Sequence, residues 1–101
     1  MPAKVILNPY AGRWKALRLR ETLEGELKNA GVDYDLVLTE APRQGTELAY
    51  QATLAGYSPI ISAGGDGSIS EVVNGIVQAS QMQGTPPPPV GLLPMGTAND
   101  L

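Results

Sequence analysis

The chain has 101 residues, of which 43% are hydrophobic and 17% are charged, a balance typical of one globular domain and not of a disordered segment. The net charge of −3 argues against nucleic acid as a partner and against general anionic-membrane binding, because both attract basic patches. Neither cysteine nor histidine occurs, which excludes disulfides, zinc–thiolate sites and a Ser-His-Asp triad within the chain.

The chain opens on a predicted strand, Lys4 to Asn8, whose apolar residues do not alternate with polar ones. This pattern is typical of a parallel strand buried on both faces. Pro9 to Gly12 turns the chain into a predicted helix, which Gly31 ends as its C′ residue. The apolar positions of that helix recur at helical spacing: Ala16, Leu19, Leu23, Leu27 and Ala30.

A second strand and helix follow. Tyr34 to Thr39 is predicted as a strand, Glu40 to Pro42 as a connection, and Gln44 to Ala55 as a helix closed by Gly56. No apolar run reaches the length of a membrane span, and the N-terminus leads directly into a strand instead of a signal peptide. We therefore expect a cytoplasmic protein.

The second half repeats the pattern. Ser58 to Ser62 is predicted as the third strand, and the third helix is expected from about Ser68 to Gln81. A proline-rich connection leads to the fourth strand, Val90 to Leu93, and residues 94–101 resemble one more strand-to-helix turn whose helix is missing.

This alternation predicts an α/β fold: a Rossmann-like parallel sheet covered by helices on both faces, in three layers. In such sheets the ligand crevice lies beyond the carboxyl ends of the strands. Four turns are expected to meet at that edge. They carry Asn8, Thr39, Gly64 to Ser68, and Gly96 to Asp100.

The turn after the third strand has three glycines around one aspartate, Gly64-Gly65-Asp66-Gly67. Glycines let the backbone approach a phosphate, and the following helix offers unpaired N–H groups and the positive end of its dipole. Asp66 is not simply another phosphate ligand, because it is an anion itself. We expect it to act on a metal, a ribose or a hydroxyl proton.

Two further positions have equally ordinary interpretations. Ser68-x-x-Glu71 also fits a capping box, in which both side chains bond to N-terminal amides of one helix. We consider this interpretation and contact of Glu71 with a ligand equally well supported by the sequence. Asn99 and Asp100 are likewise suitable as N-cap residues of a following helix.

Together these motifs resemble the diacylglycerol kinase catalytic domain, whose wider family includes bacterial lipid kinases and sphingosine and ceramide kinases. The resemblance rests on Asn8-Pro9-x-Ala11-Gly12, Thr39, Gly64-Gly65-Asp66-Gly67-Ser68, Glu71-Val72-Val73-Asn74-Gly75 and Leu93-Pro94-x-Gly96-Thr97-Ala98-Asn99-Asp100-Leu101. It implies magnesium-dependent transfer of the γ-phosphoryl group of ATP to a lipid hydroxyl. It also implies nucleotide contacts at Asn8, Pro9, Ala11, Gly12, Thr39, Gly64, Gly65, Asp66, Gly67, Ser68, Ile69, Ser70, Glu71 and Thr97. We expect Asp66 to be catalytic, orienting the acceptor hydroxyl or a hydrated magnesium.

The chain departs from the family pattern in two ways. Ser68 replaces the usual threonine but keeps its hydroxyl. The second, largely β domain, which in the family supplies the lipid pocket and further magnesium ligands, lies outside these 101 residues. We therefore expect the N-terminal nucleotide-binding part of a longer kinase that touches the membrane peripherally and meets its lipid acceptor through that second domain. Alone, residues 1–101 should bind ATP weakly or not at all and transfer no phosphate.

Other classes remain open. NAD kinases and phosphofructokinases carry Gly-Gly-Asp-Gly turns on a similar sheet, but the Leu93-Pro94-x-Gly96-Thr97-x-Asn99-Asp100 pattern resembles the lipid kinases instead. A non-catalytic nucleotide-binding module suits the short length. An open sheet edge after the fourth strand predicts a homo-oligomer.

Overall fold

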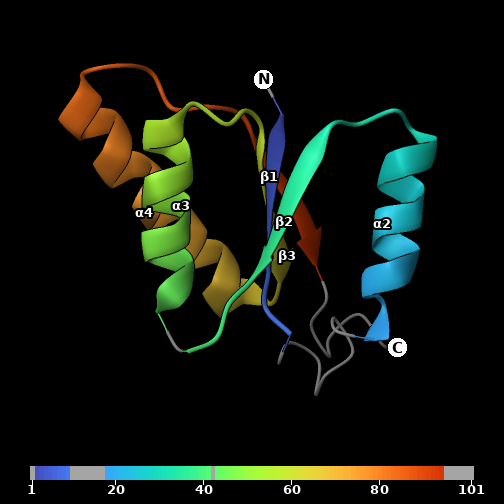
Figure 1. Ribbon diagram of the computed structural model, residues 1–101. Helices are drawn as coiled ribbons and strands as arrows, with labels where there is room; N and C mark the ends of the chain where they lie inside the picture. The colour runs from blue at the N-terminus through green and yellow to red at the C-terminus, as the bar shows by residue number, and fades with distance from the viewer. Residues whose placement is uncertain (1, 10–17, 42, 95–101) are drawn as a thin grey trace.

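The computed structural model describes residues 2–9, 18–41 and 43–94, apart from the side chains of Asp66 and Pro94. Strands and helices alternate along the chain (Figure 1). The strands are β1 (Ala3–Leu7), β2 (Tyr34–Leu38), β3 (Ile60–Gly64) and β4 (Val90–Pro94). The helices are α2 (Arg20–Asn29), α3 (Gln44–Ala55) and α4 (Asp66–Gln83).

The four strands form one parallel sheet in the order β2-β1-β3-β4. Helix α2 covers one face, and α3 and α4 lie side by side on the other (Figure 1). This is the predicted three-layer α/β architecture. The predicted turn at Gly96 to Asp100 lies outside the described residues.

Strand β1 is central, and it explains why its sequence does not alternate. Val5 and Leu7 pack with Leu23 of α2 on one face of the sheet. Ile6 points to the other face, where it belongs to the core formed with α3 and α4. All three side chains are buried, so both faces of this strand require apolar residues.

Helix α2 and helix α3 end where the sequence predicts. Gly31 and Gly56 have φ angles of +74° and +92°, a region that favours glycine, and their N–H groups bond to carbonyls of the preceding turn. Among the described helices, none is long and apolar enough to cross a bilayer.

Strand β3 and helix α4 differ from their predicted bounds by two residues at each end. Strand β3 begins at Ile60 instead of Ser58, because its pairing with β1 starts where Lys4 donates to the Pro59 carbonyl. The strand extends to Gly64 because Gly64 still pairs with Pro94 of β4. Helix α4 then begins at Asp66 instead of Ser68, so the predicted glycine turn is shorter than expected.

Candidate functional site

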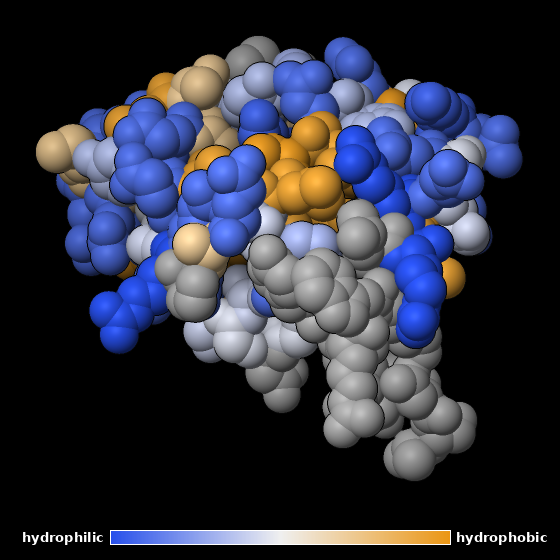
Figure 2. Space-filling model, turned by 60° about the horizontal axis from the view of Figure 1, so that its bottom comes forward, coloured by the Kyte–Doolittle hydropathy of each residue, from blue (hydrophilic) through white to orange (hydrophobic). Residues whose placement is uncertain are grey.

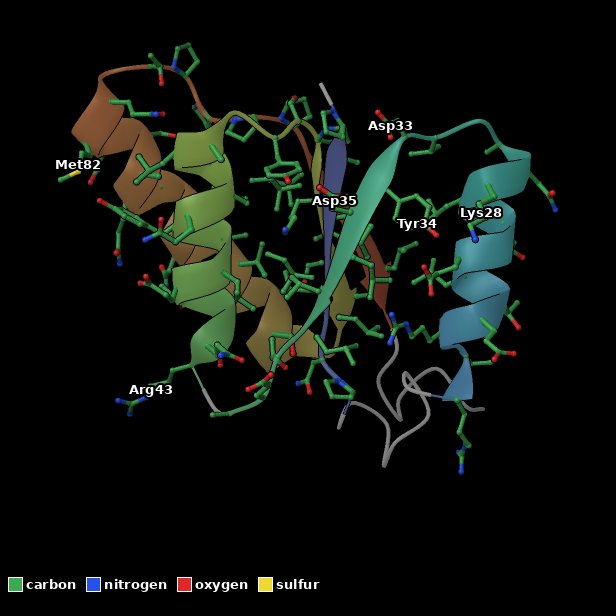
Figure 3. The ribbon with its side chains drawn as sticks, in the orientation of Figure 1. Lys28, Asp33, Tyr34, Asp35, Arg43 and Met82 are labelled. Carbon is green, nitrogen blue, oxygen red and sulfur yellow. The ribbon has the colours of Figure 1, made fainter. Side chains whose placement is uncertain are left out.

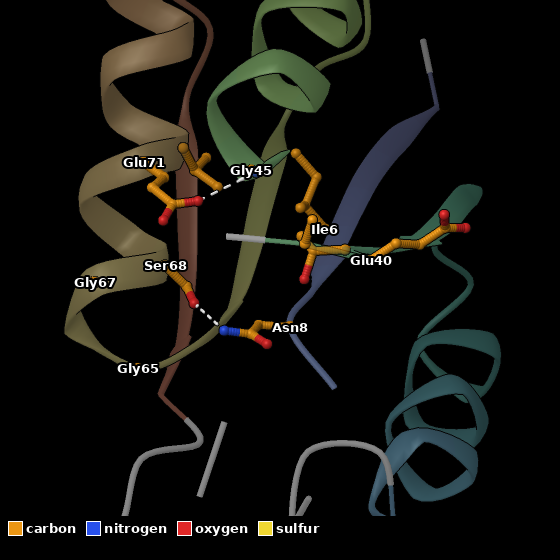
Figure 4. Close-up of a pocket in the computed structure, with 11 residues that line it drawn as sticks. Ile6, Asn8, Glu40, Gly45, Gly65, Gly67, Ser68 and Glu71 are labelled. Atoms are coloured by element: carbon orange, nitrogen blue, oxygen red, sulfur yellow. Dashed lines mark hydrogen bonds between the residues drawn. The ribbon is translucent and has the colours of Figure 1, made fainter. Parts of the chain in front are cut away.

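A cleft of about 590 Å³ opens at the carboxyl edge of the sheet (Figure 4). Figure 2 turns this edge forward and shows hydrophobic side chains gathered in the middle, with hydrophilic ones around them. Strands β1 and β2 and the N-terminal ends of α3 and α4 contribute to the cleft. Its lining residues are Ile6, Asn8, Thr39, Glu40, Ala41, Gly45, Gly65, Gly67, Ser68, Glu71 and Val72.

The predicted site residues divide into three groups. Those that line the cleft are Asn8, Thr39, Gly65, Gly67, Ser68 and Glu71. Those described but not among its lining are Pro9, Gly64, Ile69 and Ser70. Ala11, Gly12 and Thr97 lie outside the described residues, and of Asp66 only the backbone is described, as the first residue of α4.

Asn8 joins the end of β1 to the first turn of α4. Its side-chain Nδ2 donates a hydrogen bond of 2.8 Å to the Ser68 hydroxyl. Gly64 packs against both partners, since an added Cβ would lie 2.8 Å from Ser68 Oγ and 3.3 Å from Asn8 Cβ. Glycine is therefore needed at position 64 for internal packing, whereas the sequence suggested close approach of a phosphate.

The N-terminal end of α4 is open toward the cleft. Gly65 is its N-cap residue, and in the described part of the chain no side chain caps it. The first backbone bond of the helix runs from the Ile69 N–H to the Gly65 carbonyl, which leaves the N–H groups of Asp66, Gly67 and Ser68 without an intrahelical acceptor. An added Cβ at Gly65 or Gly67 would meet nothing within 4 Å. Such a helix end suits an anion.

Glu71 does not form the predicted capping box. Because α4 begins at Asp66, Ser68 is its third residue and not its N-cap. The Glu71 carboxylate instead accepts a hydrogen bond of 3.2 Å from the Gly45 N–H of α3, and its main-chain carbonyl accepts one of 2.9 Å from the Thr46 hydroxyl. Contact between Glu71 and a ligand stays a prediction.

Thr39 lies at the carboxyl end of β2, where its N–H donates to the Leu7 carbonyl of β1 at 2.9 Å. The chain then runs along the cleft through Glu40 and Ala41 into α3. Glu40 is held in place because its N–H donates to the side-chain oxygen of Gln44.

Sequence reasoning missed five lining residues. Ile6 and Val72 were taken for core alone, and Glu40 and Ala41 for a plain connection, although a connection leaving a parallel strand at this edge is itself a signal. Gly45 lacked any local signal, because its partner Glu71 is 26 residues away along the chain.

The fold and the cleft define a class: a three-layer α/β protein with a cleft at the carboxyl edge of its parallel sheet, lined in part by the N-terminal end of α4. The chain belongs to the diacylglycerol kinase catalytic domain family, whose model matches residues 2–101.

Individual relatives agree. The chain is 37% identical over 98 residues to a diacylglycerol kinase of Staphylococcus haemolyticus, covering 97% of this chain and 28% of that protein. It is 38% identical over 100 residues to a diacylglycerol kinase of Staphylococcus aureus strain JH9, covering 97% of this chain and 30% of that one. The chain thus spans less than a third of these relatives' length.

Solved structures show the same fold. A crystal structure of a diacylglycerol kinase from Bacillus anthracis superimposes with a TM-score of 0.72 at 25% identity, covering 98% of this chain and 34% of that one. Another structure from the same organism gives a TM-score of 0.80 at the same identity and covers the same shares.

Proposed function

We propose that this chain is the ATP-binding portion of a lipid kinase that phosphorylates a hydroxyl of diacylglycerol or a similar lipid. The observation that carries the proposal is the open start of α4. Gly65, Gly67 and Ser68 line the cleft there, no side chain of the described residues caps the helix, and a Cβ added at either glycine would meet nothing within 4 Å. Membership of the diacylglycerol kinase family supports a kinase.

The residues present suit the phosphates of ATP. The N–H groups of Asp66, Gly67 and Ser68 would donate to phosphate oxygens, and the absence of Cβ atoms at Gly65 and Gly67 leaves room for them. Fixed donors of this kind stabilise charge on a transferring phosphoryl group. The hydrogen bond from Asn8 orients the Ser68 side chain beside them.

Asp66 would act on the acceptor hydroxyl or on a hydrated magnesium. Bound ATP with magnesium supplies the phosphoryl group, and the acceptor hydroxyl must be aligned with it and lose its proton. Asp66 begins the helix that would hold the phosphates, so we assign it to orienting that hydroxyl or a hydrated magnesium. In the part of the chain that the structure describes, no three His, Cys, Asp or Glu side chains lie together as a metal site.

In a full-length kinase, the lipid acceptor and the membrane would be contacted by segments equivalent to the parts of the relatives that this chain does not match. We place the kinase in the cytoplasm, peripheral to the membrane.

A chimera tests the proposal. The chain replaces the matching residues of the Staphylococcus haemolyticus diacylglycerol kinase, and transfer from radiolabelled ATP to diacylglycerol, sphingosine and NAD is measured. We expect lipid phosphorylation. Phosphorylation of NAD would favour the NAD kinase alternative, and a folded chimera without any transfer would favour a non-catalytic nucleotide-binding module.

Nucleotide binding is tested on the 101-residue chain itself. The cleft is already formed in the described residues, which favours weak binding over none. Titration of the ¹⁵N-labelled chain with ATP–magnesium should shift the amide signals of Gly65, Gly67 and Ser68. Unchanged signals at millimolar ATP would remove this cleft from the proposal.

A further inference from the structure

Glu71 belongs to α4, yet its side chain and its main-chain carbonyl both accept hydrogen bonds from α3. Its Oε1 accepts from the Gly45 N–H at 3.2 Å (Figure 4). Its main-chain oxygen accepts from the Thr46 hydroxyl at 2.9 Å. Gly45 and Thr46 are consecutive residues of α3, and both bond to Glu71 of α4. These two hydrogen bonds fix the relative position of the two helices at this point.

At the N-terminal end of α3, Glu71 is the acceptor for the Gly45 N–H, whereas the N–H groups of Gln44 and Thr46 bond to backbone carbonyls of Ala41 and Arg43. The N-cap residue of α3, Arg43, has a left-handed φ of +70°, and among the described residues no side chain of its own segment caps the helix. The side-chain oxygen of Gln44 is turned back to the Glu40 N–H. A carboxylate beside a helix N-terminus is stabilised by the helix dipole, so Glu71 supplies from α4 an acceptor for the start of α3.

The backbone of α3 approaches the Glu71 side chain closely at Gly45. An added Cβ at Gly45 would lie 2.9 Å from Glu71 Oε1 and 3.3 Å from Glu71 Cβ. An alanine at position 45 would therefore require the Glu71 side chain to shift.

The contact joins the two walls of the cleft. Gly45, with Ala41 before it, lines the side of α3, whereas Gly65 and Ser68 line the side of α4. Glu71 lies at their junction and is itself half-buried. A carboxylate directed at a phosphate would repel it, but here one oxygen is bound to an N–H group of α3.

We propose that Glu71 is a positioning residue: by holding the start of α3 against α4 through Gly45 and Thr46, it sets the width of the cleft that receives the nucleotide phosphates. This inference rests on the proposed nucleotide site. Glu71 acts through α3 and does not touch the phosphates.

The test uses titration of the 101-residue chain with ATP–magnesium, followed by NMR, in wild type and five variants. Glu71→Ala should weaken ATP binding about fivefold, the equivalent of one lost hydrogen bond, and Glu71→Gln should restore most of the affinity because its amide oxygen still accepts. Thr46→Val should also weaken binding, and Thr46→Ser should restore it, although Thr46 does not line the cleft. Glu26→Ala, at an exposed position on α2, is the matched control.

The Gly45 amide proton provides a signature that stability alone would not move. Its chemical shift should change in Glu71→Ala and stay near the wild-type value in Glu71→Gln, at a temperature where thermal unfolding shows every variant to be folded. Weaker binding by Glu71→Ala with wild-type affinity in Thr46→Val and an unchanged Gly45 signal would overturn the inference, because Glu71 would then act by direct contact. Wild-type affinity in both Glu71→Ala and Thr46→Val would overturn it as well. Absence of any ATP-induced shift in the wild type would instead overturn the nucleotide site itself, and with it this inference.

Discussion

Gly75 of α4 lies directly against the Thr46 carbonyl of α3: a Cβ added to Gly75 would be 2.2 Å from that oxygen. It would also come within 2.9 Å of the Ala49 Cβ and the Tyr50 nitrogen. The two helices are therefore in backbone contact one turn beyond Glu71. This contact lets both helix N-termini reach the same cleft.

We predict that Gly75→Ala destabilises the chain. The new methyl group meets backbone atoms that cannot rotate away, and overpacking of this kind costs about 1–3 kcal/mol or more. Gly25→Ala is the matched control, because its Cβ would meet nothing within 4 Å and alanine in a helix is favoured by about 0.5–1 kcal/mol. Urea unfolding of both variants measures the difference. Equal stability of Gly75→Ala and wild type would mean that the helices are further apart than described.

We predict that Gly65→Val weakens ATP binding, with a loss of stability limited to the cost of valine at the N-cap of α4. The backbone of Gly65 is extended, with φ of −90°, and its added side chain would enter open space where the phosphates are proposed to lie. Gly56→Ala should leave binding nearly unchanged, but it is strained by a φ of +92° and should lower stability instead. Calorimetric or NMR titration with ATP–magnesium and thermal unfolding separate the two effects. Equal affinities for ATP would remove Gly65 from the site.

The sequence predicted the elements well because each signal is local. The apolar run Val5, Ile6 and Leu7 indicates a strand buried on both faces. Gly31 and Gly56 indicate helix ends, and neither signal depends on residues distant in the sequence. The first residue of α4 could not be predicted from such local signals. Pairing of Gly64 with Pro94 extends β3 by two residues, and that leaves Asp66 and Gly67 to begin the helix.

The site was predictable in place but not in its contacts. Asn8, Thr39 and Ser68 lie at strand and helix ends that the topology brings to one edge, so the topology alone placed them at one cleft. For Glu71 the sequence left two interpretations equal, a capping box with Ser68 three residues away and contact with a ligand, and a capping box is a local pattern. The actual partner of the Glu71 side chain is Gly45, which only the packing of α3 on α4 brings near.

We predict that stability falls in acid partly through Glu24. Tyr34 reaches from β2 toward α2 (Figure 3) and donates a hydrogen bond of 2.8 Å to the Glu24 carboxylate. This bond, together with Arg20 at 3.1 Å, lowers the pKa of Glu24 below its ordinary value. The stabilisation is thus fully present above the ordinary glutamate pKa of about 4.3 and is lost as the pH falls through the lowered pKa of the folded state.

Removing the Tyr34 hydroxyl tests this. Tyr34→Phe should be less stable near neutral pH, and its melting temperature should fall less steeply between about pH 5 and 3 than that of the wild type. Tyr50→Phe is the control, since the Tyr50 hydroxyl donates to the Met82 sulfur and not to a carboxylate of the described residues. Parallel pH profiles for Tyr34→Phe and wild type would count against the assignment.

We propose that the chain associates with itself through the side formed by α4 and β4. In the described sheet β4 is an edge strand, and its Val90 and Leu92 are 40% and 52% exposed. Val73 and Val77 of α4 are similarly exposed, and residues 72–99 contain no charged side chain that would repel a second copy.

Sedimentation at about tens of micromolar measures this association. Leu92→Lys should shift the chain toward monomer, because a charge at an edge strand opposes pairing. Val32→Lys changes an exposed valine elsewhere and should have no such effect. A clean monomer for the wild type would refute the proposal.

We predict, finally, that Asp66 is required for phosphoryl transfer in the chimeric kinase and that residues 1–101 alone transfer none. Alignment of the acceptor contributes on the order of 7–11 kcal/mol in well-oriented systems, and this chain offers no described pocket for a lipid. Asp66→Asn keeps the size of the side chain but removes the charge that would orient the hydroxyl and take its proton. We expect kcat to fall by about 10²–10⁴-fold, with a smaller change in ATP affinity. Asp33→Asn, at an exposed position before β2, is the control. A chimera that keeps its rate with asparagine at position 66, or a 101-residue chain that phosphorylates lipid as fast as the chimera, would show that this division of the chemistry is wrong.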